Sequence, residues 1–67
     1  MMTLDDVRKR VDEIRRVSWD DEVAHSREGD LHIDVLRAIA DGAAEDPNAM
    51  AKLALETCDI DFARWCA

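Results

Sequence analysis

The chain has little of what small catalytic and cofactor sites are commonly built from. Its 67 residues include two glycines, one proline, two cysteines and three aromatic residues, with no tyrosine. Gly29 and Gly42 are isolated from each other, which excludes a glycine-rich loop that cradles a phosphate. Cys58 and Cys66 lack the C-x-x-C spacing of zinc ribbons and redox motifs, and they make no disulfide framework.

Long apolar runs and a basic surface are also missing. No stretch approaches the roughly 20 apolar residues of a membrane-spanning helix, and no N-terminal segment resembles a signal peptide. We therefore expect a cytoplasmic protein that contacts no membrane. The net charge is −7, and residues 19–46 carry this excess with nine acids against two arginines. Because nucleic-acid binding needs a basic footprint, we expect no direct nucleic-acid partner.

What is present is helical patterning, clearest at the N-terminus. Leu4, Val7, Val11 and Ile14 follow one another at steps of three and four residues, which places them on one side of a helix. Thr3 precedes this run and is a suitable N-cap, with acids following in the first turn. The pattern predicts a first helix over about residues 4–17.

A second helix is predicted over about residues 19–41. Ser18 suggests a boundary between the first two helices, although an unbroken helix also fits the spacing. Glycine in a helix interior lowers the stability of the helix, so a kink near Gly29 is also possible. Gly42 is a suitable C-terminal stop.

Two shorter elements follow. Pro47 after an acid is typical of a helix start and predicts a third helix over about residues 47–57. The ending predicts a last helical turn or two over residues 60–66, with Phe62 and Trp65 covering the core. The chain is thus expected to be one all-α domain, residues 1–67. Its architecture would be a small bundle of three helices plus a short C-terminal helical turn. So small a core favours completion by homodimerisation.

Ionisable residues continue the helical spacing along the second helix. Asp21, His25, Glu28 and His32 are separated by three or four residues, as in metal sites that take two ligands from one helix. These four are the candidate metal ligands, for zinc or iron. Asp21 and His32 would lie about 16 Å apart along a helix, too far to share one ion. A closed site would therefore need a second helix, most naturally an antiparallel copy of this one.

Three interpretations of these four residues stay open. The apolar face of the second helix is better centred on Ala24, Leu31, Val35 and Ala38, which would leave the four at its edge, pairing with one another or with arginines. They could instead form a polar layer at a dimer seam. Metal binding is the third interpretation.

Several runs of the chain resemble a known group of proteins. The runs are DDEVAHSRE at residues 20–28, Leu31-His32, VLRAIADG at residues 35–42 and the ending DIDFARWCA at residues 59–67. They are similar to small proteins encoded by actinobacterial phages and prophages. The resemblance implies a phage-encoded protein in a bacterial cytoplasm, and it supplies neither an activity nor a site residue.

Two functional hypotheses remain. The first is a small acidic protein–protein interaction module that forms a homodimer, modulates a host or phage protein and needs no cofactor. The second is a metal-binding helical homo-oligomer using the four candidate ligands. We expect no enzyme, because no serine or cysteine has a catalytic partner fixed by a motif, and Cys58 is expected to be buried.

Overall fold

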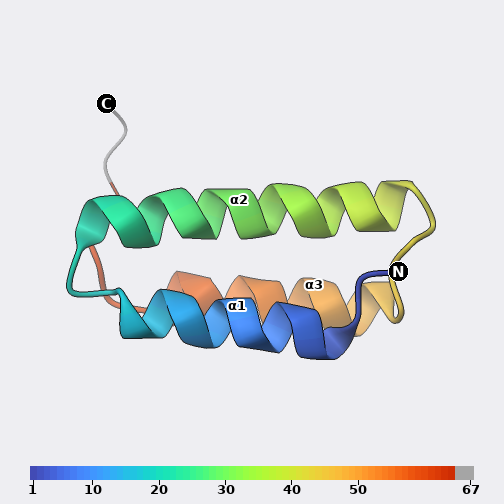
Figure 1. Ribbon diagram of the computed structural model, residues 1–67, viewed down its shortest axis with the longest axis horizontal. Coiled ribbons are helices and arrows are strands. Elements are labelled where there is room, and N and C mark those ends of the chain that lie inside the picture. Colours follow the sequence, from blue (N-terminus) through green and yellow to red (C-terminus); the bar gives the residue numbers. More distant parts are fainter. Residues whose placement is uncertain (65–67) are drawn as a thin grey trace.

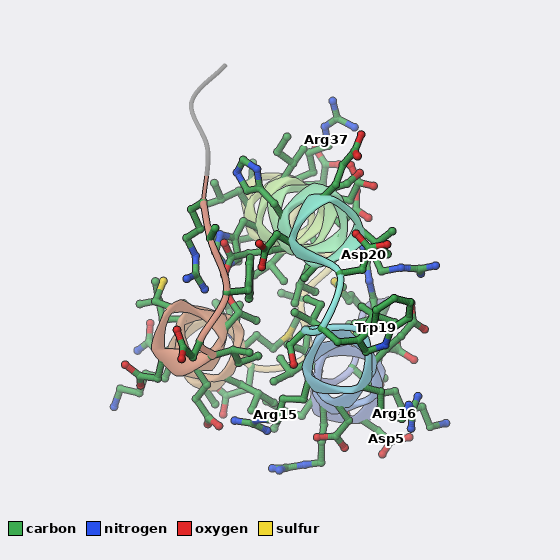
Figure 2. The ribbon with its side chains drawn as sticks, turned by 90° about the vertical axis from the view of Figure 1, so that its left-hand side faces the viewer. Asp5, Arg15, Arg16, Trp19, Asp20 and Arg37 are labelled. Carbon is green, nitrogen blue, oxygen red and sulfur yellow. The ribbon has the colours of Figure 1, made fainter. Side chains whose placement is uncertain are left out.

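Three helices account for most of the chain. The computed structural model describes residues 1–64, with α1 over Leu4–Arg16, α2 over Asp21–Ala40 and α3 over Pro47–Leu55, followed by a 3-10 turn over Glu56–Asp59. The long helix α2 lies above α1 and α3 (Figure 1), and a view along the helices places the three at the corners of a triangle (Figure 2). The predicted all-α bundle is confirmed. Among residues 1–64, no helix is long and apolar enough to cross a membrane.

Local signals fix the first and third helix starts as predicted. The Thr3 hydroxyl accepts the backbone N–H of Asp6 at 3.1 Å, and the Asp6 carboxylate accepts the N–H of Thr3 at 2.9 Å. These hydrogen bonds satisfy N–H groups that have no partner within the helix, and they lower the pKa of Asp6. At α3, the Asp46 carboxylate accepts the N–H of Ala49 at 3.1 Å, and Pro47 takes the first helical position.

The boundary between α1 and α2 lies where Ser18 predicted it, but another residue caps the second helix. Asp20 is the N-cap, and its carboxylate accepts the N–H of Val23 at 3.2 Å. Ser18 instead donates its hydroxyl to the carbonyl of Arg15, at the end of α1. Gly29 does not interrupt α2, which is continuous, and Gly42 ends the region with a φ of 68°.

One chain forms its own apolar core. The buried side chains of α1 are those predicted from its stripe (Val7, Val11 and Ile14), and those of α2 include Ala24, Leu31 and Val35. Met50, Leu53 and Ala54 of α3 pack against them, together with Ile60 and Phe62. Completion of this core by a second copy therefore stays a prediction.

The predicted helical turn over residues 60–66 is wrong in its described part. The 3-10 turn comes earlier, at Glu56–Asp59, and residues 60–64 form no helix. Their backbone groups form hydrogen bonds with side chains instead. The Ile60 and Phe62 carbonyls accept hydrogen bonds from the Arg64 side chain, and the N–H of Ala63 donates to the Asp21 carboxylate at 3.0 Å. Phe62 is buried against the core as predicted, whereas Trp65 lies outside the described residues.

Candidate functional site

An ion pair joins the C-terminal segment to the middle of α2. Arg64 donates from Nε and Nη2 to the two carboxylate oxygens of Glu28, at 2.9 and 3.0 Å. The Glu28 side chain is only 7% exposed, whereas that of Arg64 is 33% exposed. We call this bidentate pair the C-terminal clasp. Its planar geometry is the strong form of arginine–carboxylate recognition.

The guanidinium of Arg64 also holds its own segment. It donates to the carbonyl oxygens of Thr57, Ile60 and Phe62 at 2.7, 3.1 and 3.2 Å. It lies over the Phe62 ring, with its carbon 3.9 Å from the ring centroid, within the range of a cation–π contact. One side chain therefore connects α2, the 3-10 turn and the segment that follows.

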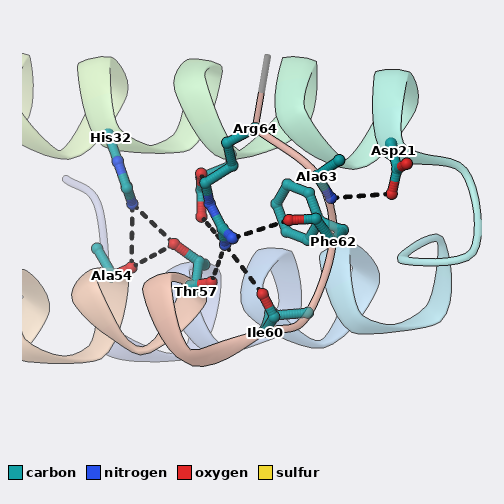
Figure 3. A network of polar contacts seen from close by, with 9 residues as sticks. Asp21, His32, Ala54, Thr57, Ile60, Phe62, Ala63 and Arg64 are labelled. Atoms are coloured by element: carbon teal, nitrogen blue, oxygen red, sulfur yellow. Dashed lines mark hydrogen bonds and ion pairs between the residues drawn. The ribbon is translucent and has the colours of Figure 1, made fainter.

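A second polar contact lies beside the clasp. The Nε2 atom of His32 is 2.9 Å from the Thr57 hydroxyl and 3.1 Å from the Ala54 carbonyl oxygen (Figure 3). Because the Thr57 hydroxyl donates its own hydrogen to Ala54, the network is satisfied when Nε2 carries a proton. Among the described residues, every buried side-chain polar atom has a hydrogen-bond partner.

Two opposing effects set the ionisation of Glu28. Burial acts to raise the pKa of the carboxyl, but the hydrogen bonds and positive charge of Arg64 outweigh it and hold the pKa below its ordinary value. The same hydrogen bonds raise the pKa of Arg64. Both groups are therefore charged at neutral pH, and each stabilises the other's charge.

The structure separates the four candidate metal ligands. Asp21 accepts a hydrogen bond from the backbone, and His25 is exposed. Glu28 and His32 instead come together with Cys58, so that one ligand atom from each lies within 4.8 Å of the others. Glu28 also pairs with an arginine, as the edge interpretation allows, though it lies deeper than that interpretation predicts. The spacing along α2 indicated that Glu28 and His32 lie close together, but it carried no signal for Cys58.

Cys58 and Arg64 are the residues that the sequence analysis missed. Cys58 is exposed, contrary to expectation, because the tighter 3-10 turn replaces the last turn of the predicted helix. Arg64 pairs with a residue 36 positions earlier, and helical spacing carries no signal for so distant a contact. The available indication was Glu28 itself, an acid on an otherwise buried helix face. A buried carboxylate needs a cationic partner.

An apolar groove runs between α2 and α3 next to the clasp. Its lining includes His32, Val35, Leu36, Ile39, Ala51, Ala54 and Leu55, and it encloses about 240 Å³. Among residues 1–64, no charged side chain lines it. Leu36 and Leu55 are 65% and 61% exposed, which is high for leucine. We call this surface the α2–α3 groove.

Comparisons with known proteins supply no identity. No protein-family model matches the chain, and neither a curated protein nor a solved structure is similar to it. The resemblance to phage proteins therefore remains a prediction. Function has to be argued from the clasp, the ligand group and the groove.

Proposed function

We propose that this protein is a protein–protein interaction module without catalytic activity, whose α2–α3 groove receives an apolar helix of another polypeptide chain. The observation that carries the proposal is the groove itself: an uncharged concave surface flanked by two exposed leucines. Exposed apolar surface of this kind on a small protein commonly marks a contact with another molecule. A helix lying in an apolar groove is a recurrent form of such recognition.

The groove suits a protein helix energetically. Covering Leu36 or Leu55 removes a large apolar side chain from water, worth about 1.5–3 kcal/mol each when burial is complete. No charge has to be desolvated, because the lining contains none. The polar lining residue, His32, already makes its hydrogen bonds to Ala54 and Thr57, so a partner leaves no donor stranded there.

The chain's charge and the phage resemblance favour a particular kind of partner. A net charge of −7 steers basic surfaces toward the protein. The resemblance implies a bacterial cytoplasm in which the partner is a host or phage protein. Binding would modulate that protein by covering part of its surface.

Position-dependent photo-crosslinking in a bacterial host tests the groove. A photoreactive amino acid in place of Leu55 should give a discrete protein adduct, because that side chain borders the groove. The same amino acid in place of Arg8, which is exposed on α1, should give none. Leu36→Asp should abolish the Leu55 adduct, as read by gel shift and mass spectrometry. Equal adducts at both positions, or none at Leu55, would contradict the proposal.

A second candidate function, metal binding, rests on the group of Glu28, His32 and Cys58. Imidazole, carboxylate and thiolate are all zinc ligands, and the three ligand atoms already lie within 4.8 Å of one another. Arg64 occupies the Glu28 carboxylate, so zinc and the clasp would compete for it. Three protein ligands would leave a fourth zinc position for water or for a group from another chain.

This competition gives an unusual expected result for Arg64→Ala. Removing the guanidinium should strengthen zinc binding by about tenfold, because a charged hydrogen-bond partner no longer competes. Cys58→Ser should weaken it by more than about tenfold, while His25→Ala, outside the group, should leave it unchanged. Titration against a chromophoric chelator, in a Cys66→Ser background, measures all three. Identical affinities in all the variants would eliminate this site.

A further inference from the structure

Gly29 lies in the middle of α2, where nothing within its own chain requires a glycine. A glycine in a helix interior destabilises the helix relative to alanine. Here α2 is continuous, and the positive φ that favours glycine is found at Gly42 instead. A Cβ atom built on Gly29 meets nothing within 4 Å. The space above Gly29 is therefore open toward the outside of the molecule, where a second molecule could use it.

Gly29 belongs to a stripe of uncharged residues along one side of α2. The stripe contains His25, Gly29, Ile33, Leu36 and Ala40, at steps of three and four residues. Ile33 and Leu36 are 48% and 65% exposed. Seven of the 20 residues of α2 are charged, and of these seven only Glu22, in the first turn before His25, lies on this side of the helix. We call it the uncharged stripe; Leu36 belongs to both the stripe and the α2–α3 groove.

The stripe is complementary to itself when reversed. Gly29 and Leu36 lie equally far from the midpoint between His32 and Ile33, and so do His25 and Ala40. We infer that α2 packs antiparallel against α2 of a second copy, about a two-fold axis at this midpoint. Each Leu36 then fills the space above Gly29 of the other copy, and each His25 faces a small alanine. Isologous contacts of this kind are the commonest in homo-oligomers.

Charge supports the same arrangement. Asp30 and Arg37 flank the stripe on one side, and Arg37 points away from the other two helices (Figure 2). In an antiparallel pair like flanks meet, which brings Asp30 of one copy within about 3 Å along the axis of Arg37 of the other. Neither residue forms an ion pair within residues 1–64.

Farther round α2 from the stripe, beyond Asp30 and Arg37, charged side chains pair with α1. Asp34 pairs with Arg10 of α1 at 2.8 Å, and Arg27 pairs with Glu13 of α1. Asp30 lies next to these pairs, one helical turn from both Arg27 and Asp34, and between them and the stripe. This leaves the stripe and the α2–α3 groove as one continuous apolar surface for the second copy. The inference rests on the proposed function and names the partner of the same surface.

Sedimentation equilibrium of the full chain over a range of concentrations tests the inference. The wild type should be a dimer. Gly29→Leu should raise the dissociation constant by at least about tenfold, because the second copy's leucine loses its space. The same variant should keep or raise the melting temperature of the monomer, since leucine favours helix more than glycine does. A merely destabilising substitution would lower that temperature.

Charge reversal provides the matched control. Asp30→Arg and Arg37→Asp should each weaken the dimer by about tenfold, and the double variant should restore it. Arg8→Asp, on α1, should not change it. A monomer at all concentrations, or a dimer indifferent to Gly29→Leu and to the charge reversals, overturns the inference. If the Leu55 adduct then contains a different protein, the proposed function stands without this partner. If the adduct is absent as well, both fail.

Discussion

Replacing Leu31 by alanine should remove most of the protein's stability. Leu31 is fully buried on α2, with an exposed fraction of 0%, at the centre of the core. Truncation of such a leucine costs about 2–5 kcal/mol, from lost burial and from the cavity left behind. A domain of this size has a total stability of only about 3–10 kcal/mol. Denaturant unfolding followed by circular dichroism should show a large fall in the midpoint.

The same helix offers a matched control for Leu31. Leu36 is also a leucine of α2, but it is 65% exposed. Leu36→Ala should change the free energy of unfolding by no more than about 0.5 kcal/mol, measured where the protein is monomeric. Equal losses for the two variants would show that α2 buries a different face from the one described.

The sequence predicted best those features that are decided within a few residues. Thr3 caps α1 because its hydroxyl reaches an N–H only three residues away, and the pairing of Asp46 with Pro47 starts α3 for the same kind of local reason. Gly42 ends the α2 region with a positive φ, which glycine adopts without strain. These signals depend on no distant contact, so the sequence contains them completely.

The buried face of α2 was also predictable, because periodicity reports it. The offset between the apolar face and the ionisable residues places Ala24, Leu31 and Val35 in the core, as observed, whereas Ala38 of the same predicted face is only half-buried. His25 is exposed and His32 is half-buried, in keeping with a position at the edge. Periodicity indicated on which side of α2 Glu28 lies, but not that its carboxylate pairs with Arg64.

The contacts of the C-terminal segment could not be predicted, because each joins residues far apart in the chain. A helical turn over residues 60–66 was reasonable from local spacing alone. In the structure Arg64 instead binds the carbonyls of Ile60 and Phe62, which a helix over these residues would have used for itself. The conformation of this segment depends on Glu28, whose carboxylate binds the Arg64 guanidinium at α2. The tertiary ion pair thus overrides the local preference.

Arg64→Ala should destabilise the protein in a pH-dependent way. At pH 7 the substitution leaves a charged Glu28 buried without its partner, and we expect a loss of about 2–3 kcal/mol, allowing for the partial exposure of Arg64. Arg8→Ala, which removes an exposed arginine of α1, should cost no more than about 0.5 kcal/mol. Thermal or denaturant unfolding at several pH values measures both.

The sign of the pH dependence should reverse between wild type and variant. In the wild type the pKa of Glu28 is held below its unfolded value, so its stabilising effect is present above that value and is lost as the pH falls through the folded pKa. Without Arg64, burial dominates and raises the pKa. The folded variant then binds a proton more readily than its unfolded chain, and acidification stabilises it relative to wild type. The difference in free energy of unfolding between wild type and Arg64→Ala should therefore become smaller from pH 7 to about pH 4.

A second substitution separates the stranded charge from the other contacts of Arg64. Glu28→Gln in the Arg64→Ala background removes the buried charge and should recover part of the lost stability at pH 7. It should also remove the gain in stability that the Arg64→Ala variant shows on acidification, because the group that titrates in the variant is gone. Recovery should be incomplete, since the carbonyls of Ile60 and Phe62 still lack the guanidinium. A stability loss for Arg64→Ala that is constant from pH 7 to pH 4 would mean that Glu28 escapes to solvent, and that the clasp does not hold the C-terminal segment through a buried charge.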